Sequence, residues 1–528
     1  MKHLTGNNLV LLILGMILLF SGSCSSTDSQ QISVSIQADN QTITLSLPRG
    51  TTVREALEKA EFSTGALDQV DPPLFSVLNV DTTITLSRVR EEFEIETAIL
   101  PFTRQNIHSE SLPAGDKIML QPGENGLEEI TIRILFIDGV ETSQTIANRV
   151  TLTPPRTEIL MVGVQPSYLP VQLEGMIVYI DAGNAWMMHG TSHTKQPLVL
   201  TGDLDSRIFE LSPDGKWLLY SRADEHQEGE EINSLWIIST DNSDLEPIDL
   251  KISNVVHFAS WSPKPTRDNY QIAYSTVEPR SSSPGWQANN DLRILSLSPG
   301  GRLLQTEIVL EENPGGQYGW WGTFFSWSPD ASRFAFTRAD AIGLVDPGNP
   351  SFETLLEVVP FEVGNDYVWT PDIAWGPESQ ILYVHIHSEG NQAYTTQNPG
   401  SFSLLALDTT SRSGQVLLEQ TGIFAYPTIS IRDHEITDTW LILLTPVNAA
   451  QLMNTRYNLA RLDTDGSNFS SLFPPDNTIG LEPYPPIPSP YDEAILFIHN
   501  QDLWLYNTTD EDASQLTGSG QVTACDWK

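Results

Sequence analysis

The side chains best suited to contact a ligand are three neighbouring aromatic residues, Tyr318, Trp320 and Trp321. They follow a glycine-containing run and come directly before an apolar segment that ends at Trp327. An aromatic ring gives a large contact area, and the Tyr hydroxyl and the Trp N–H add a polar atom. These three residues are the candidates for ligand contact, with packing as the alternative.

Metal-binding patterns are weak. His189 and His193 are four residues apart, but their segment reads as strand and loop, and no Glu lies between them as in His-Glu-x-x-His. Residues 462–468 lack the spaced acidic partner of a calcium loop and fit a hairpin turn better. Asp214 and Asp330 follow proline in tight turns, where a carboxylate caps its own backbone. We predict no metal site and no cofactor.

Motifs of catalysis are missing as well. The chain contains no G-x-S-x-G elbow, no Walker loop and no dinucleotide fingerprint. We therefore predict no catalytic residues.

A repeat organises the long segment 170–528, which carries the candidate residues. One unit is an apolar strand, a Ser-Pro turn and a second strand, found at 208–221, 258–275, 324–337 and 372–385, with weaker copies at 427–444 and 485–498. A second unit, strand-turn-strand, occurs at 185–201, 235–250, 292–308, 342–357, 402–418, 459–473 and 503–517. Four strands per repeat of about 40–60 residues are typical of a β-propeller.

Seven outer hairpins stand against six complete inner hairpins. Residues 176–180 supply a second strand, and 522–527 supply a first strand that ends in Trp527. Joining them predicts a seventh blade made from both ends of the segment, with six or eight blades as alternatives. Such closure removes exposed sheet edges. The Ser-Pro-Asp-Gly and Asp-Gly-Ser turns resemble TolB-type propeller repeats of bacterial envelope proteins.

Large rings recur at one position of this repeat. They are Trp261, Trp327, Trp375 and Trp527, which we expect to pack between neighbouring blades. Cys525 lies two residues before the last ring and is expected to be a buried small residue.

Regularly placed glycines mark residues 91–165. Gly115, Gly123, Gly126, Gly139 and Gly163 stand at turn positions between alternating strands, where positive φ is often needed. Their order resembles the G-five (G5) domain, an elongated and mostly single-layer β structure. The resemblance implies binding of N-acetylglucosamine-containing glycan such as peptidoglycan.

Residues 31–90 form a smaller pattern. An alternating segment broken at Asp39-Asn40 predicts a hairpin, Thr51-Thr52 precede a helical stripe beginning at Val53, and 83–89 predict a further strand. This order resembles a ubiquitin-like β-grasp fold.

The N-terminus carries an export signal. Residues 1–24 hold a short basic start, an apolar run from Leu9 to Phe20 and small residues before Cys24. The run is shorter than the ~20 residues of a spanning helix. The pattern resembles a bacterial lipobox, although Ser21 stands where that family prefers Leu; it implies lipidation of Cys24. Residues 25–30 read as a polar tether.

Composition limits the partners. Lys plus Arg number 28 against 67 Asp plus Glu, a formal charge of −39, which disfavours nucleic acid and anionic lipid surfaces. Membrane attachment therefore needs the lipid anchor.

Three functions follow from these patterns. The first is a non-enzymatic cell-envelope lipoprotein, extracytoplasmic, that binds wall glycan through its G-five domain and a protein or peptide at a propeller face. The second is a propeller hydrolase or lyase that uses acidic channel residues on an extracellular substrate. The third is a structural spacer.

Overall fold

The computed structural model describes residues 30–109, 112–164, 168–223, 231–242, 245–264, 269–363, 367–388, 401–431, 439–449, 454–475, 478–491 and 493–528. Strands dominate, and the described part of the chain holds one helix, α1 (Val53–Lys59). Within these ranges, none of the helical structure is long or apolar enough to cross a bilayer. The chain divides into two compact units: a first unit up to Arg104 with Gln121–Glu158, and a second unit of Gln105–Leu120 with Ile159–Lys528.

The first unit begins with a mixed four-stranded sheet in the order β2-β1-β4-β3. The strands are β1 (Gln31–Ala38), β2 (Gln41–Pro48), β3 (Gln69–Asp71) and β4 (Thr82–Ser87), and β1 runs parallel to β4. The hairpin predicted at Asp39-Asn40 is confirmed, and both turn residues have positive φ. Thr52 caps α1 through a reciprocal bond with Glu55. The sequence analysis missed β3.

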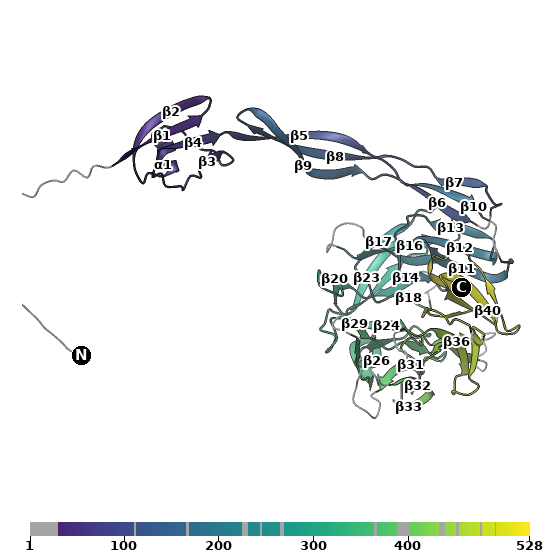
Figure 1. Ribbon diagram of the computed structural model, residues 1–528. Coiled ribbons are helices and arrows are strands. Elements are labelled where there is room, and N and C mark those ends of the chain that lie inside the picture. The colour runs from purple at the N-terminus through teal and green to yellow at the C-terminus, as the bar shows by residue number, and fades with distance from the viewer. Residues whose placement is uncertain are drawn as a thin grey trace, which may run out of the picture. The chain divides into compact units, whose positions relative to one another are not determined.

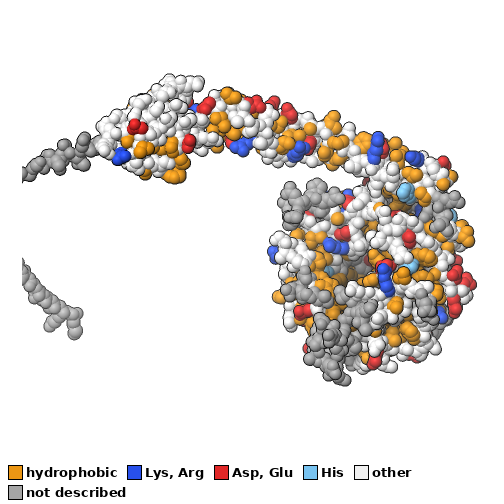
Figure 2. Space-filling model, viewed as in Figure 1, with side chains coloured by type: hydrophobic (Ala, Val, Ile, Leu, Met, Phe, Trp, Pro, Cys, Tyr) orange, Lys and Arg blue, Asp and Glu red, His pale blue; other side chains and the backbone are white. Residues whose placement is uncertain are grey.

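A second sheet of the first unit has the order β5-β8-β9. It comprises β5 (Val89–Leu100), β8 (Gly126–Ile137) and β9 (Val140–Thr153). Every residue of β9 is exposed. Apolar side chains stand on the surface of this part of the chain (Figure 2), and Phe93, Ile95 and Ile99 of β5 are more than half exposed.

Arg88 joins the two sheets of the first unit. Its guanidinium donates to both carboxylate oxygens of Asp39 (2.8 Å each) and to Asp68 Oδ2 (2.8 Å). Its backbone N–H donates to Asp138 Oδ1 (2.7 Å) in the turn between β8 and β9. The hydrogen bonds from Arg88 lower the pKa of Asp39. The Arg88 side chain thus holds the β1–β2 turn and Asp68, and its backbone N–H holds the β8–β9 turn, so this residue joins the two sheets.

The second unit includes a three-stranded sheet in the order β6-β10-β7. Its strands are β6 (Arg104–Ser109), β7 (Lys117–Gln121) and β10 (Glu158–Gly163). Ile107, Ile159 and Met161 from this sheet share one apolar core with Trp186 and Met188. Residues 91–165 therefore contribute strands to both units.

Seven four-stranded antiparallel sheets make up most of the described second unit (Figure 1). The strands of each sheet are given in hydrogen-bonded order, and the first of each is called its inner strand. The first six sheets are β14 (Leu204–Leu211), β15 (Trp217–Ala223), β16 (Asn233–Ser239), β17 (Ile248–Ser253); β18 (Ala259–Trp261), β19 (Tyr270–Tyr274), β22 (Leu292–Leu297), β23 (Leu303–Leu310); β24 (Phe324–Trp327), β25 (Phe334–Arg338), β26 (Ala341–Asp346), β27 (Asn349–Glu357); β30 (Ile373–Trp375), β31 (Ile381–Ser388), β32 (Ser401–Asp408), β33 (Gly414–Glu419); β34 (Thr428–Ile431), β35 (Thr439–Pro446), β36 (Tyr457–Asp463), β37 (Ser470–Phe473); and β38 (Ile487–Pro488), β39 (Ala494–His499), β40 (Asp502–Asn507), β41 (Asp512–Gln515).

The seventh sheet combines the two ends of the repeat segment. Its order is β13 (Lys195–Val199), β12 (Asn184–Thr191), β11 (Gln172–Asp181) and β42 (Val522–Trp527). Tyr179 lies opposite Cys525, and Met176 and Lys528 exchange backbone hydrogen bonds of 2.7 and 3.0 Å. The pairing predicted between the last strand and the strand near Met176 is confirmed.

Two accessory hairpins were not predicted as such. They are β20 (Val277–Pro279) with β21 (Trp286–Ala288), and β28 (Phe361–Val363) with β29 (Tyr367–Trp369). The first lies between β19 and β22 of one sheet, and the second lies between β27 and β30 of two consecutive sheets.

Indole groups link neighbouring inner strands. Nε1 of Trp261 donates to the carbonyl oxygen of Glu210 (3.1 Å), that of Trp327 to Ser260 (3.4 Å) and that of Trp375 to Ser326 (3.2 Å). All three rings are buried. Trp527 is also buried, and its Nε1 donates to the carbonyl oxygen of Glu174 (2.9 Å). The predicted packing role of these rings is confirmed.

Candidate functional site

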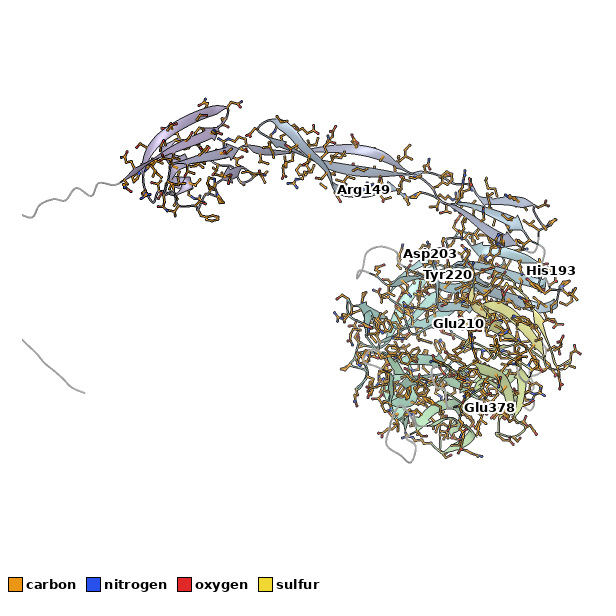
Figure 3. The ribbon with its side chains drawn as sticks, viewed as in Figure 1. Arg149, His193, Asp203, Glu210, Tyr220 and Glu378 are labelled. Atoms are coloured by element: carbon orange, nitrogen blue, oxygen red, sulfur yellow. The ribbon has the colours of Figure 1, made fainter. Side chains whose placement is uncertain are left out.

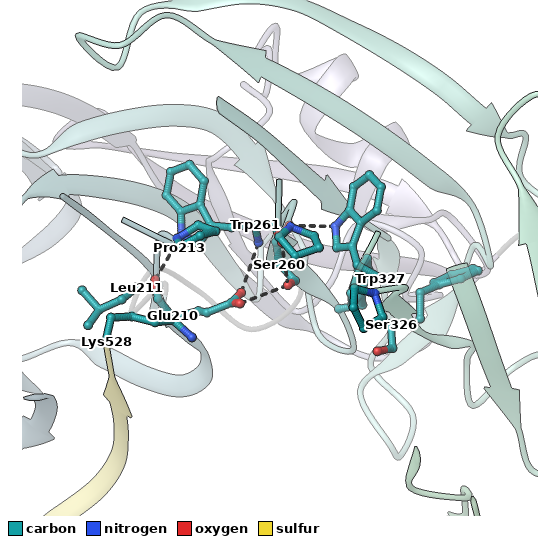
Figure 4. Close-up of a pocket in the computed structure, with 12 residues that line it drawn as sticks. Glu210, Leu211, Pro213, Ser260, Trp261, Ser326, Trp327 and Lys528 are labelled. Atoms are coloured by element: carbon teal, nitrogen blue, oxygen red, sulfur yellow. Dashed lines mark hydrogen bonds between the residues drawn. The ribbon is translucent and has the colours of Figure 1, made fainter. Parts of the chain in front are cut away.

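A cavity of about 580 Å³ opens beside the inner strands β14, β18 and β24 (Figure 4). Glu210, Ser260 and Ser326 line it from one shared repeat position, each directly before the strand's last buried residue. Lys528 lines the same cavity from the end of β42. The pairing of β42 with β11 therefore brings a cation from the end of the sequence beside a carboxylate more than 300 residues earlier.

Proline turns contribute to the apolar lining of this cavity, which also includes Leu211, Phe258, Trp261, Phe325 and Trp327. Pro213, Pro263 and Pro329 follow the strands and line it. In the first turn, the hydroxyl of Ser212 accepts from the N–H of Trp217 (3.0 Å) and donates to Asp214 (2.7 Å). The carboxylate of Asp214 thus caps its own turn, as predicted, and the equivalent Ser328–Asp330 pair at 2.6 Å repeats the arrangement. These bonds hold the proline rings at the cavity.

Glu210 is the acidic side chain among the residues that line the cavity. It is half-buried and lies among the strands of the second unit (Figure 3). Its two oxygens accept one hydrogen bond each, from the hydroxyl of Ser260 (3.2 Å) and from the N–H of Trp261 (3.2 Å). Burial raises the pKa of Glu210 to about 7, against the opposing charge of Lys528 and with further help from Asp526. This carboxyl can therefore change charge near neutral pH.

Asp526 and Lys528 form the other charged group at this place. Oδ2 of Asp526 accepts from the N–H of Leu211 (2.7 Å), and Oδ1 lies 4.0 Å from Nζ of Lys528. The carboxylate of Asp526 raises the pKa of Lys528; burial opposes this shift and Glu210 adds to it. The surroundings of the cavity therefore favour a positive charge.

The carboxylates of Glu210 and Asp526 also have a structural role. Both carboxylates accept hydrogen bonds from backbone N–H groups of a neighbouring strand, so they are used in joining sheets. Within the part of the chain that the structure describes, no group of three or more His, Cys, Asp and Glu side chains could hold a metal ion.

The aromatic candidates Tyr318, Trp320 and Trp321 lie together, but not among the residues that line this cavity. The ring of Trp321 contacts those of Trp286 (5.4 Å) and Tyr367 (5.3 Å), which belong to the two accessory hairpins. These contacts favour packing for Trp321. Trp320 is half-buried, and its ring centroid lies 5.8 Å from that of Trp321.

Tyr318 stands at the surface of the same aromatic group. Its hydroxyl donates to Oε1 of Glu362 in β28 (2.5 Å). This hydrogen bond, with lesser effects of burial and nearby negative charge, raises the pKa of Tyr318 to about 12. The hydroxyl is thus kept protonated and oriented.

Sequence reasoning missed Glu210, Asp526 and Lys528. The available signal was the repeat itself, because Glu210 is a carboxyl at the position that Ser260 and Ser326 occupy in the next two copies. A charged residue at an inner repeat position marks a departure from the pattern. Asp526 and Lys528 gave no local signal of their own.

The five predicted glycines have two different structural reasons. Gly115 and Gly139 have φ of +91° and +81°, as expected for turns. Positive φ is wrong as the reason for Gly123, Gly126 and Gly163. A Cβ there would lie 2.4 Å from the Phe102 ring, 2.3 Å from the carbonyl oxygen of Thr153 and 2.0 Å from that of Pro113, respectively. These three permit close approach of neighbouring chain segments.

The remaining predicted residues have mixed outcomes. Cys24 lies outside the described residues. Cys525 is a free thiol and is half-buried, not fully buried as predicted, because it sits at the margin of an apolar core. His189 is exposed on β12, whereas His193 is half-buried with its ring 6.0 Å from that of Tyr168 (Figure 3).

Comparison with known proteins identifies one domain. The family model of the G5 domain matches residues 91–165, the predicted bounds. Resuscitation-promoting factor Rpf2 of Corynebacterium glutamicum is 28% identical over 113 residues, which are 21% of this chain and 30% of that protein. The chain thus spans less than a third of that relative's length.

Two solved structures are similar to parts of this chain. The structure titled HP0197-G5 is 20% identical, covers 14% of this chain and 99% of its own, and has a TM-score of 0.14. TolB from Acinetobacter baumannii is 13% identical, covers 71% of this chain and 95% of its own, and has a TM-score of 0.33.

Proposed function

We propose that this protein is an exported, non-enzymatic lipoprotein of a bacterial cell envelope that binds cell-wall glycan and a protein or peptide partner. The observation that carries the proposal is the G5 domain at residues 91–165. Lipidation of Cys24 would hold the protein at the membrane, with its folded units extracytoplasmic.

The first contact is with glycan. The sheet β5-β8-β9 leaves β9 exposed along its whole length and presents Phe93, Ile95 and Ile99 to solvent. Sugar rings have apolar faces, and a contiguous exposed apolar row is a common mark of a binding surface. This row is the part of the G5 segment that we assign to N-acetylglucosamine-containing glycan.

The second contact is at a closed ring. We assign the seven sheets to seven blades, with β42 on β11 as the closure. Contacts of β14 with both β42 and β18, and of β34 with both β30 and β38, support this arrangement. The indole hydrogen bonds between inner strands support it further. A rigid ring presents loops and channel residues at fixed positions, which suits a protein or peptide partner.

Two places on this ring are candidates for partner contact. One is the cavity at Glu210 and Lys528. The other is the aromatic group at Tyr318, Trp320 and Trp321, all of which are half-buried, with Trp321 packed against both accessory hairpins.

An enzymatic role is the second candidate, because Glu210 has a pKa of about 7, a value suited to general acid–base work. We favour binding, because backbone N–H groups engage the carboxylates of Glu210 and Asp526, and because the residues that line the cavity beside the hydroxyls of Ser260 and Ser326 include no histidine.

Retention on purified peptidoglycan tests the glycan contact. The protein should co-sediment, and Ile95→Asp with Ile99→Asp should lower retention about tenfold, because charge on the apolar row opposes contact with a sugar face. Val140→Asp, at an equally exposed position of β9 (69%), is the matched control and should bind normally. Failure of the unaltered protein to co-sediment would remove the glycan role.

A further inference from the structure

We propose that the cavity at Glu210 receives an alkylammonium group, presented as a lysine side chain by the protein or peptide partner. This inference rests on the proposed function and names the chemistry of the partner at one of its sites.

The first observation is spare acceptor capacity. A carboxylate can accept about four hydrogen bonds, and each oxygen of Glu210 accepts one, at 3.2 Å. These oxygens stand in the wall of the cavity (Figure 4). A group entering the cavity with N–H donors would complete their hydrogen bonding.

The second observation is the balance of charge. The charged groups that face one another here are Glu210 from β14 with Asp526 and Lys528 from the end of β42; β18 contributes the neutral Ser260 hydroxyl and Trp261 N–H. Lys528 lies beside Asp526, 4.0 Å away. One negative charge therefore remains when Glu210 is ionised, and a cation would neutralise it.

The third observation is that an ammonium already resides in this environment. Lys528 lines the cavity, and the carboxylates raise its pKa in spite of burial. A second ammonium beside Glu210 would meet the same field, weakened by the charge of Lys528 itself.

The shape of the cavity suits the stem of such a side chain. Pro213 is exposed, and Pro263 and Pro329 are half-buried, so three apolar rings line the cavity together with Glu210. A lysine side chain pairs an apolar stem with a charged end. The overall charge of −39 would also steer a cationic partner toward the protein.

The test uses two small probes on the purified protein that share the backbone and the four-carbon side-chain stem and differ in the terminal ammonium. N-acetyl-lysine N-methylamide should bind about tenfold more tightly than the uncharged N-acetyl-norleucine N-methylamide, measured by ligand-observed NMR at pH 8. Glu210→Gln should raise the dissociation constant of the lysine probe about tenfold. Equal binding of the two probes would overturn the inference.

Two further variants guard against misfolding as an explanation. Lys528→Met removes the competing ammonium and should tighten binding of the lysine probe, a direction that a damaged fold cannot give. Glu307→Gln removes an exposed charge on β23 and should leave binding unchanged. Unchanged binding in Glu210→Gln, or weaker binding in Lys528→Met, would contradict the inference.

The pH dependence gives an independent readout. Affinity for the lysine probe should fall about tenfold from pH 8 to pH 6 as Glu210 gains its proton, and Glu210→Gln should show no such fall. Peptidoglycan retention does not involve Glu210, so failure of the probes with retention intact would remove this inference and leave the proposed function standing.

Discussion

Trp261 and Glu210 bond to each other twice across two neighbouring sheets. The indole Nε1 of Trp261 donates to the backbone carbonyl of Glu210 (3.1 Å), and the carboxylate of Glu210 accepts from the backbone N–H of Trp261 (3.2 Å). One residue pair therefore fixes the lateral position of two inner strands and also places an acidic group in the cavity.

Removing the indole N–H should weaken the second unit. Trp261→Phe keeps an aromatic ring but leaves the Glu210 carbonyl without its donor, so we expect a loss of about 1–2 kcal/mol in the free energy of unfolding. Urea denaturation followed by tryptophan fluorescence measures it. Trp440→Phe is the control, because that ring is half-buried with the Arg461 guanidinium 4.3 Å above its centroid. An equal loss in both variants would refute a special role for the Trp261 hydrogen bond.

The ionisation of Glu210 should make stability fall with rising pH. Its pKa is about 7 in the folded protein against 4.5 for the free side chain, so the folded state binds more protons between these values. Stability from this group is complete below about pH 4.5 and is lost as pH rises through 7, with a total of about 1–3 kcal/mol. Glu210→Gln should flatten that part of the curve in thermal unfolding. A variant whose curve keeps the slope of the unaltered protein would show that another group is responsible.

Arg88 should control the joint between β4 and β5. Arg88→Met removes the hydrogen bonds to Asp39 and Asp68, so amide exchange around residues 87–89 should become about tenfold faster. The pKa of Asp39 is lowered by the hydrogen bond from Arg88. The stabilisation that Asp39 gives through this hydrogen bond is therefore present above the ordinary pKa of Asp, and it is lost as the pH falls through the lowered pKa. Arg54→Met, on the exposed side of α1, serves as the control. Equal amide exchange rates in both variants would show that Arg88 does not hold the segment between β4 and β5.

Two glycines of the G5 domain should respond differently to alanine. At Gly126 a Cβ would lie 2.3 Å from a backbone carbonyl, whereas at Gly139 there is open space and only the φ of +81° opposes it. We expect Gly139→Ala to cost about 1 kcal/mol and Gly126→Ala clearly more, because backbone must move. Thermal unfolding of the two variants compares them; equal losses would rule out close approach as the reason for Gly126.

Repetition made most of the second unit predictable from sequence. Strong copies such as 208–221 and 324–337 gave strands directly, and even the degraded copy at 427–444 contains β34 and β35. The hairpin at Asp39-Asn40 and the cap at Thr52 were readable because local backbone chemistry decides them.

Long-range pairing explains what could not be predicted. Asp526 and Lys528 meet Glu210 only through the pairing of β42 with β11, and no local pattern marks them. Close approach at Gly163 depends on Pro113, fifty residues earlier. The accessory hairpins that surround Trp321 lie in insertions outside the repeat, where periodicity gives no guide.

The binding face that we propose requires that the last strand closes the ring. Tyr179 lies opposite Cys525 in the β11–β42 register, so Tyr179→Cys, with Cys24 replaced by serine, puts two thiols on facing strands at a separation suited to a disulfide. Intact-protein mass spectrometry after mild oxidation should show a single intramolecular disulfide between positions 179 and 525. Two thiols that stay free and open to alkylation in the folded protein would contradict closure.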